Sequence, residues 1–359
     1  MEFLATEEQR DFARSLDAML AAAGTPTVIR AWAAGDQSPG RALWSRLAEA
    51  GALALAVPEP YEGVGPLPVE LVTAFVELGR HGVPGPAVET VAVSALLAEL
   101  ARQGDDGPAK RLLPGIATGG TIATLAVGAP PAPPRGAALD ADSADLVLVV
   151  RGDELRIADG YEDVRISADP ARRFARPAPG GELLAAGPGV TAAVARAGDW
   201  AMLATAAQAL GVGLTLLERT VAYAKQRRQF GTAIGSFQAV KHRLADTLIA
   251  LEFARPLVFG AALTFASTGP SDTGPATTGL ASTDLASTDL ASTDLAAAKV
   301  TAGEAAYTAA RTALQIHGAI GYTEELDLSL WLRKARPLRD AWGTPSWCRA
   351  RVLDAYGGS

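Results

Sequence analysis

The pattern of apolar residues changes twice along the chain, and these two changes constrain the fold more than any other feature. Residues 1–118 and 191–359 consist mostly of segments whose apolar residues recur at helical spacing, such as EEQRDFARSLDAML and PVELVTAFVELGRHG. Between them, residues 119–190 contain short alternating or β-branched runs, such as ADLVLVVRGDELRIADG, separated by Gly, Pro and Asp. The sequence therefore predicts a mainly α fold with a small β domain between two helical parts.

We place an N-terminal helical domain at residues 1–118, a reduced middle β domain at 119–190 and a C-terminal helical bundle at 191–359. The bundle includes a low-complexity linker at 267–295, where the pentapeptide LASTD is repeated between residues 280 and 295. A five-residue period turns successive leucines by about 140° on a helix with ~100° per residue, so no single face becomes apolar. We expect either a flexible linker or a weakly held helix extension here.

Charge and composition exclude several kinds of partner and site. The net charge of −7 argues against nucleic acid, because phosphate backbones favour basic faces. No run of about 18 apolar residues is present, so we expect no membrane span, and the acidic N-terminus does not resemble a signal peptide. The single Cys348 excludes an internal disulfide, and the scattered His81, His242 and His317 suggest no metal site. We expect a cytoplasmic protein.

The most informative local pattern is the stretch QRRQFGTAIGSFQAVKHRLAD, residues 226–246, which joins two long apolar helical segments. One interpretation is a polar connection between helices. The other is a turn that grips a phosphorylated ligand, because the guanidinium of Arg227 would present a planar, permanently charged fork of donors. Further along, QIHGAIGYTEELDLSLWLRKAR places Gln315 and Gly318 where a strongly predicted helix ends.

Together the two motifs resemble those of the acyl-CoA dehydrogenase family, and the resemblance extends over nearly the whole chain. RRQFG resembles the family's Arg-x-x-Phe-Gly turn, and QIHGAIG resembles its Gln-x-x-Gly-Gly-x-Gly motif. PEPYEGVG and VELGR resemble its N-terminal helical domain. The resemblance implies an N-terminal helical domain, a middle β domain and a C-terminal four-helix bundle. It also implies FAD, whose adenosine-diphosphate half is held by the C-terminal domain of a neighbouring subunit in that family.

On this resemblance, the cofactor-binding residues are Arg227, Phe230, Phe237, Gln238, Gln315, Gly318 and Ala319. Arg227 would hold the pyrophosphate and Phe230 would offer an aromatic wall. Gln315 and Gly318 would meet the dinucleotide where a helix ends in a glycine turn. Each also has a plainer interpretation: a solvated arginine, a helix-surface amide, or aromatic rings that pack in the bundle. His317 is expected to be structural.

The family's reaction needs a carboxylate base, which takes the proton α to the thioester while the flavin accepts a hydride from the β carbon. In most members this glutamate lies just before a Gly-Thr pair, and here Trp342 occupies that place. A second group carries the base on the helix before the Arg-x-x-Phe-Gly turn, where this sequence has Ala201. Asp199 and Asp340 each lie two residues away from these positions, which is about 200° around a helix. Both usual base positions are therefore vacant, and we assign no catalytic residue to this chain.

Residues 119–190 also lack the family's flavin-covering stretches, Thr-Glu…Gly-Ser-Asp and Trp-Ile-Thr-Asn. We therefore expect a subunit of a heteromeric, α2β2 acyl-CoA dehydrogenase, of the kind found in actinobacterial degradation of steroid side chains. A homologous catalytic partner would supply the base and bind the acyl-CoA, and an electron-transfer flavoprotein would accept the electrons. Two alternatives stay open. One is a self-sufficient homo-oligomer whose base is Asp199, Glu218, Asp340 or another residue; the other is a flavin-free scaffolding paralogue.

Overall fold

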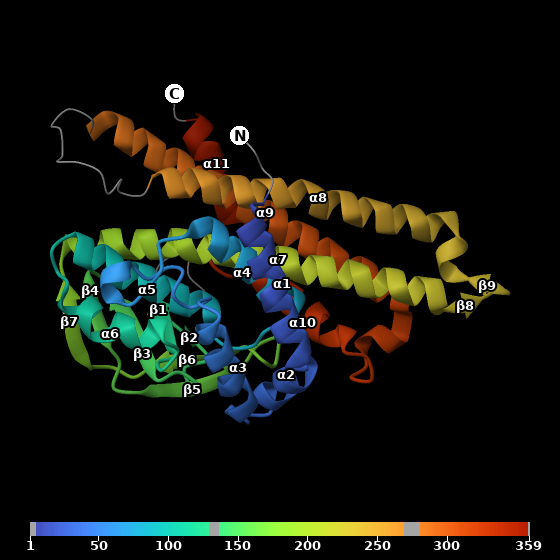
Figure 1. Cartoon of the computed structure of the whole chain (residues 1–359), viewed down its shortest axis with the longest axis horizontal. Coiled ribbons are helices and arrows are strands. Elements are labelled where there is room, and N and C mark those ends of the chain that lie inside the picture. Colours follow the sequence, from blue (N-terminus) through green and yellow to red (C-terminus); the bar gives the residue numbers. More distant parts are fainter. Residues whose placement is uncertain (1–4, 129–135, 269–280, 358–359) are drawn as a thin grey trace.

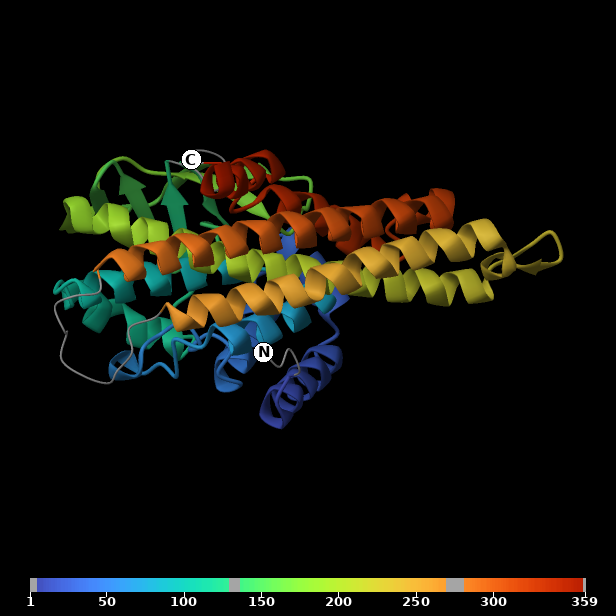
Figure 2. The same cartoon turned by 90° about the horizontal axis from the view of Figure 1, so that it is seen from above.

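The computed structural model describes residues 5–128, 136–268 and 281–357. Three long helices run side by side along the long axis of an elongated molecule: α7 (Pro188–Gln226), α8 (Gln238–Ser267) and α9 (Ala281–His317) (Figures 1 and 2). Two shorter helices, α10 (Leu328–Asp340) and α11 (Pro345–Gly357), pack against α9 and complete the C-terminal bundle. The predicted fold class, mainly α with a small β domain, is confirmed.

The N-terminal part is helical, as predicted. Its helices are α1 (Glu7–Ala22), α2 (Thr25–Ala33), α3 (Ser38–Glu49), α4 (Pro68–Arg80), α5 (Ala87–Arg102) and α6 (Gly107–Ala117), with a 3-10 turn, η1 (Glu59–Tyr61), before α4. Helices α4 and α5 lie directly on α7. A Cβ atom on Gly211 would lie 2.0 Å from the carbonyl oxygen of Val76, and one on Gly79 would lie 2.1 Å from that of Gln208. Helices α4 and α7 therefore cross at backbone contact, which only glycine allows.

The β region consists of two small sheets. Its strands are β1 (Ala123–Val127), β2 (Ala138–Leu139), β3 (Leu146–Arg151), β4 (Glu154–Ile157), β5 (Tyr161–Ile166), β6 (Arg173–Pro177) and β7 (Glu182–Ala186). One sheet has the order β1-β3-β4-β7, with β1 and β3 parallel and Leu125 opposite Leu148. The other has the order β2-β6-β5. The Nζ atom of Lys334 on α10 lies 2.9 Å from Oδ2 of Asp169, in the loop between β5 and β6. This buried ion pair connects the second sheet to the bundle.

By length and composition alone, α7 and α8 are each long and apolar enough to cross a membrane. A few polar residues interrupt the apolar runs of both helices in the sequence, but the mean hydropathy of each helix stays high. In α7, 89% of the apolar window is buried inside the protein, which is typical of the core helix of a soluble protein. In α8 only 33% is buried, and this helix follows the upper edge of the molecule in Figure 1.

The LASTD repeat lies at the beginning of α9, which is helical from Ala281 onward. Residues 269–280, in the middle of the expected linker, lie outside the described residues. At the end of the repeat, Ala291, Ser292 and Leu295 are buried. The side chain of Ser292 donates a hydrogen bond of 2.8 Å to Asp199 on α7. The last pentapeptide therefore packs in the bundle, although the pentapeptide period by itself builds no apolar face.

Candidate functional site

The first motif forms a hairpin that projects from one end of the bundle. After α7 ends, β8 (Arg228–Gln229) and β9 (Thr232–Ala233) pair, and the 3-10 turn η2 (Ile234–Ser236) leads into α8 (Figure 1). The N–H of Arg227 donates to the carbonyl of Tyr223, and its own carbonyl accepts from Ile234, both at 2.8 Å. The backbone at Arg227 is thus fixed while its side chain stays exposed.

Phe230 lies at the tip of this hairpin with its side chain in solvent. It is 93% exposed, and its φ of 52° is uncommon for a residue other than glycine. Its ring meets that of Phe237 edge to face, with centroids 6.2 Å apart. The ring of Phe230 is therefore open to a ligand, although its backbone adopts a left-handed conformation. Gln238, which is exposed, is the first residue of α8.

The second motif ends α9 and forms a pocket of about 400 Å³. Gln315, Gly318 and Ala319 line it together with Arg311, Leu314 and Tyr322. Gly318 has a φ of 65° and begins the 3-10 turn η3 (Gly318–Tyr322). No atom lies within 4 Å of the place where a Cβ would be. Glycine is therefore favoured here by the left-handed backbone conformation and not by a close neighbour.

The two motifs meet at one end of the bundle. The rings of Tyr223, one turn before Arg227, and His317, two residues after Gln315, stack with centroids 4.1 Å apart and an interplanar angle of 25°. Burial lowers the pKa of His317, and its Nδ1 lies 2.8 Å from the carbonyl oxygen of Ala313. His317 thus connects the helix ends, in line with the structural role expected for it.

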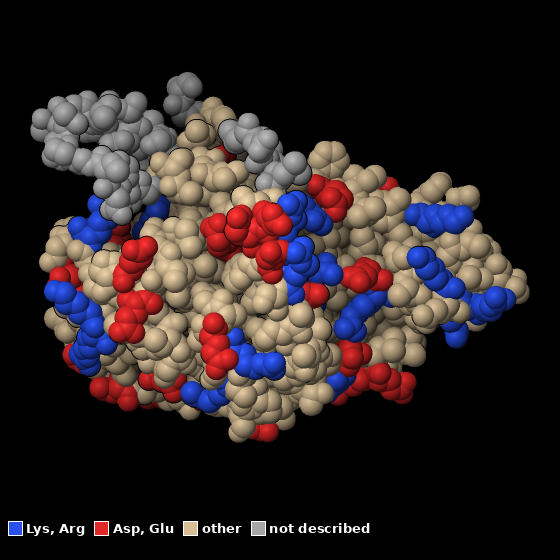
Figure 3. Space-filling model, viewed as in Figure 1, with Lys and Arg blue, Asp and Glu red and all other residues tan. Residues whose placement is uncertain are grey.

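This end of the protein is basic although the whole chain is acidic. Residues 219–245 contain Arg219, Lys225, Arg227, Arg228, Lys241 and Arg243 and no Asp or Glu. Figure 3 shows blue side chains gathered at the right-hand end of the molecule, over the hairpin and the adjoining helix ends. Such a local excess of positive charge attracts phosphate groups even when the net charge is negative.

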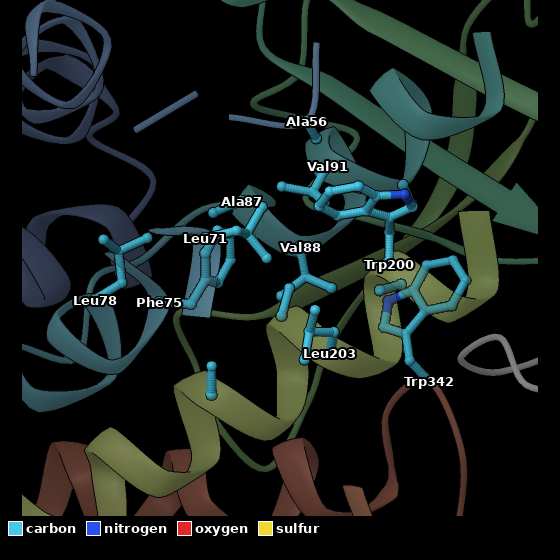
Figure 4. Close-up of a cluster of buried hydrophobic side chains, with 14 of the residues drawn as sticks. Ala56, Leu71, Phe75, Leu78, Ala87, Val88, Val91, Trp200, Leu203 and Trp342 are labelled. Atoms are coloured by element: carbon cyan, nitrogen blue, oxygen red, sulfur yellow. The ribbon is translucent and has the colours of Figure 1, made fainter. Parts of the chain in front are cut away.

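The two usual base positions lie inside the hydrophobic core between α5 and α7. Trp342 is 2% exposed and Ala201 is fully buried. Figure 4 shows Trp342 beside Trp200 and Leu203 in a cluster of apolar side chains. Trp342 has a φ of 49°, an outlier for so bulky a residue. Both positions are therefore packed within the core and have little contact with solvent.

A carboxylate that the sequence reasoning missed, Glu89 of α5, contacts Trp342. The indole Nε1 of Trp342 donates a 3.1 Å hydrogen bond to Oε1 of Glu89. Glu89 is 1% exposed, and its Oε2 has no hydrogen-bond partner in the part of the chain that the structure describes. The only signal in the sequence was an acid within the apolar stretch AVETVAVSALL. Both its low exposure and the burial of Oε2 shield this carboxylate from solvent.

The loop that carries Trp342 is anchored from inside by Lys299 of α9. Its Nζ donates to the carbonyl oxygens of Arg339 at 3.0 Å and Gly343 at 3.2 Å. Complete burial lowers the pKa of Lys299 to about 8. A buried amine therefore fixes the backbone on both sides of the base position, which argues against a movable loop there.

The three carboxylates that the sequence offered as alternative bases are each paired with an arginine. Burial raises the pKa of Asp199, which also accepts the hydrogen bond from Ser292. Each of the three is thus engaged by an arginine of this chain rather than free to meet a substrate. The pairs are Asp199 with Arg351 at 3.7 Å, Asp340 with Arg339 at 3.3 Å, and Glu218 with Arg80 at 3.2 Å.

One group of potential metal ligands is present that the sequence did not suggest. Ligand atoms of Asp17, Glu77 and His81 lie within 4.8 Å of one another, because the packing of α1 on α4 brings Asp17 to a Glu-His pair one helical turn apart. Nε2 of His81 lies 2.7 Å from Oδ1 of Asp17. Nε of Arg80 lies 3.4 Å from Oε2 of Glu77, close enough for an ion pair although not in hydrogen-bond geometry. Arg80 already supplies a cation here, so we interpret the group as an ion-pair network.

Comparison with known proteins places the chain in a family. The model of the acyl-CoA dehydrogenase N-terminal domain matches residues 6–120, and that of the C-terminal domain matches residues 188–356. Acyl-CoA dehydrogenase IpdE2 of Mycobacterium tuberculosis is 31% identical over 332 residues, which cover 92% of this chain and 91% of that protein.

Solved structures share the whole fold. The ChsE4-ChsE5 complex from Mycobacterium tuberculosis superimposes with a TM-score of 0.80 and 24% identity over 100% of both chains. The Tcur3481-Tcur3483 steroid ACAD, solved as a variant, gives a TM-score of 0.79 and 24% identity over 98% of both chains. With both of its helical domains matched and a relative similar along nearly its full length, this chain belongs to the acyl-CoA dehydrogenase family.

Proposed function

We propose that this chain is the base-lacking subunit of a cytoplasmic, heteromeric α2β2 acyl-CoA dehydrogenase. The observation that carries the proposal is the contrast between its base positions and its dinucleotide-binding motif. The two base positions, occupied by Trp342 and Ala201, are buried in the core, whereas the residues that match the family's dinucleotide-binding motif are exposed at the end of the bundle. A homologous partner would supply the glutamate and bind the acyl-CoA.

The residues at the end of the bundle fit the adenosine-diphosphate half of FAD. When bound, FAD supplies the acceptor for the hydride that leaves the substrate. Arg227 offers a charged fork for the pyrophosphate, and Phe230 and Phe237 offer aromatic surface for the adenine. Gln238 adds an amide at the start of α8. The pocket of Gln315, Gly318 and Ala319 leaves backbone and amide groups open to the dinucleotide.

The exposed face of α8 is suited to pack on a partner subunit. Ile249, Phe253 and Leu257 follow one another at intervals of four residues, and they are 52%, 69% and 46% exposed. Leu248, at 46% exposed, widens this stripe. A contiguous apolar surface of this kind marks an interaction site rather than an ordinary solvated face. We name these four residues the α8 stripe. It shares its helix with the flavin motif, which fits a flavin held between subunits.

Two solved structures with this fold support a heteromeric assembly and a steroid substrate. One solved structure with this fold is a ChsE4-ChsE5 complex, and another is a Tcur3481-Tcur3483 steroid ACAD. We propose that the assembled enzyme oxidises the acyl-CoA of a steroid side chain. An electron-transfer flavoprotein would reoxidise the flavin. The two alternatives are less well supported: a self-sufficient enzyme would need an accessible base, and a pure scaffold would not need an exposed Phe230 in a basic surface.

The test is the visible absorption spectrum of this chain, purified alone and then co-purified with a homologous full-length dehydrogenase encoded beside it. We expect flavin absorption only in the co-purified complex, at about one flavin per heterodimer. Acyl-CoA oxidation should accompany the complex and be absent from the isolated chain. A yellow isolated chain that oxidises acyl-CoA unaided would overturn the proposal.

A further inference from the structure

A second pocket lies near the beginning of α7, between α5, α7 and the Pro-rich loop that includes η1. Its volume is about 680 Å³, within the range of small-molecule sites. Its walls are mostly apolar and include Pro58, Pro60, Pro66, Ala98 and Trp200. Four charged residues complete it, Glu59, Glu99, Arg102 and Arg196.

Three of these four charges are accounted for without a ligand. Nε and Nη2 of Arg102 donate to the two oxygens of Glu99, at 2.8 and 2.6 Å, and Gln103 adds a hydrogen bond of 2.9 Å to the same carboxylate. Glu59 is exposed to water. Arg196 differs, because within the described part of the chain its guanidinium has no ion-pair partner and no hydrogen-bond acceptor. Its Cζ lies 3.9 Å from the centroid of the Phe265 ring.

Arg196 is held in place although no acceptor among the described residues meets its donors. Phe265 is fully buried and in turn meets Trp200 edge to face at 5.3 Å, so the cation rests on a rigid aromatic pair. Burial lowers the pKa of Arg196, yet an arginine stays charged in proteins. A partly desolvated guanidinium at the wall of an apolar pocket, with no acceptor among the described residues, favours an anionic ligand.

We propose that this pocket binds a small monocarboxylate with an apolar ring body, whose carboxylate pairs with Arg196 and whose ring lies against Trp200 and the proline wall. The charges of Asp199 and Glu99 act on Arg196 from beyond ion-pair distance and leave its donors to a ligand with one negative charge. A polyphosphate is disfavoured because Glu59 and Glu99 line the same pocket. A neutral apolar ligand would leave the guanidinium unsatisfied, which costs binding free energy.

The site is separate from the proposed flavin contacts and does not depend on them. Arg196 and Arg227 lie near opposite ends of the single helix α7. At ~1.5 Å per residue, this places them about 45 Å apart along its axis. The carboxylate pocket can therefore be tested on the full chain alone, without flavin or a partner subunit.

The experiment is isothermal titration of the full chain with 2-naphthoate and, as a matched neutral probe, 2-naphthamide. We expect the carboxylate to bind at least tenfold more tightly than the amide, the scale of a charge-assisted hydrogen bond. Arg196→Met, which retains an apolar contact with Phe265, should remove this preference. Arg196→Lys should keep part of it, and Arg10→Met, which alters an exposed arginine on α1, should change nothing.

A second variant tests the place of binding without touching the charge. Ala98→Trp should fill the pocket and abolish naphthoate binding while Arg196 is retained. Equal affinity for naphthoate and naphthamide in the unaltered chain would overturn the proposal, whether or not the variants fold. So would unchanged naphthoate binding in Arg196→Met or in Ala98→Trp, when circular dichroism shows that the variant is folded.

Discussion

The ring of Tyr223 stacks on the ring of His317, with centroids 4.1 Å apart. This contact joins the last turns of α7 and α9, and each helix carries one of the two motifs proposed to bind FAD. The stacking fixes how the hairpin after α7 lies relative to the glycine turn after α9. Two motifs far apart in the sequence thereby become one surface.

Tyr223→Ala should weaken FAD binding in the assembled complex, because the ends of α7 and α9 would no longer be held together. Aromatic pairs contribute about 0.5–1.5 kcal/mol, so we expect FAD to bind roughly 2- to 10-fold more weakly. Tyr223→Phe keeps the ring and should bind FAD normally. Flavin fluorescence titration of the deflavinated complex measures both. An equal loss in the two variants would point to the hydroxyl group and contradict a stacking role.

Arg227→Ala should loosen FAD in the assembled complex by about 1.5–3 kcal/mol, the scale of a hydrogen bond to a charged group. The backbone at Arg227 is fixed by its hydrogen bonds to Tyr223 and Ile234, so the loss would come from the side chain. Arg10→Ala, an exposed arginine on α1, serves as the control. The same titration at raised salt should shrink the difference, since exposed charges are screened. Unchanged flavin affinity in Arg227→Ala would refute its assigned role.

Trp342→Phe should destabilise the isolated chain, because it removes the one hydrogen bond to Glu89 that the described residues provide. A buried acceptor left unsatisfied costs about 1–3 kcal/mol. The double variant Glu89→Leu, Trp342→Phe removes both polar partners and should be less destabilised than Trp342→Phe alone. Urea denaturation of the two single variants and the double variant gives the coupling free energy. Additive effects would show that the pair does not interact as the structure has it.

The sequence was sufficient to predict the fold class and the motifs. It was insufficient to predict which side chains pack around them. The texture of residues 119–190 predicted the small sheets, and the Arg-x-x-Phe-Gly turn predicted a connection between long helices, because both patterns are local. Glu89 was missed because its partner, Trp342, lies 253 positions away in the chain. Likewise, apolar periodicity cannot distinguish α7, whose apolar window is 89% buried, from α8, which exposes the α8 stripe. Burial is decided by neighbours that are remote in sequence.

Phe253→Asp, in the α8 stripe, should prevent assembly with the partner subunit while leaving this chain folded. Its side chain is 69% exposed in the isolated chain, so a carboxylate there meets water. In a complex, the same carboxylate would be buried without a partner, at a cost of several kcal/mol. Leu183→Asp alters a leucine that is 47% exposed on β7 and should not affect assembly. Size-exclusion chromatography of the co-purified proteins distinguishes the two. Normal assembly of Phe253→Asp would remove the α8 stripe from the interface.

The pH dependence of stability should include a contribution from Asp140. Complete burial raises the pKa of this carboxyl to about 7, against the opposing effect of Arg173, whose backbone N–H donates to Oδ1 at 2.8 Å. The folded protein therefore holds a proton that the unfolded chain releases near pH 4. This stabilising contribution is complete at low pH, declines as pH rises above about 4 and is lost above about pH 7.

Asp140→Asn should remove this decline, because an amide accepts the same hydrogen bond and does not titrate. Asparagine also tolerates the φ of 49° at this position. We expect the variant to be more stable than the unaltered chain by about 2–4 kcal/mol near pH 8 and to differ little near pH 4. Urea denaturation at both pH values measures the difference. Asp105→Asn, at an exposed aspartate, is the control. A gain in stability that is the same at both pH values would show that the titration of Asp140 is not its cause.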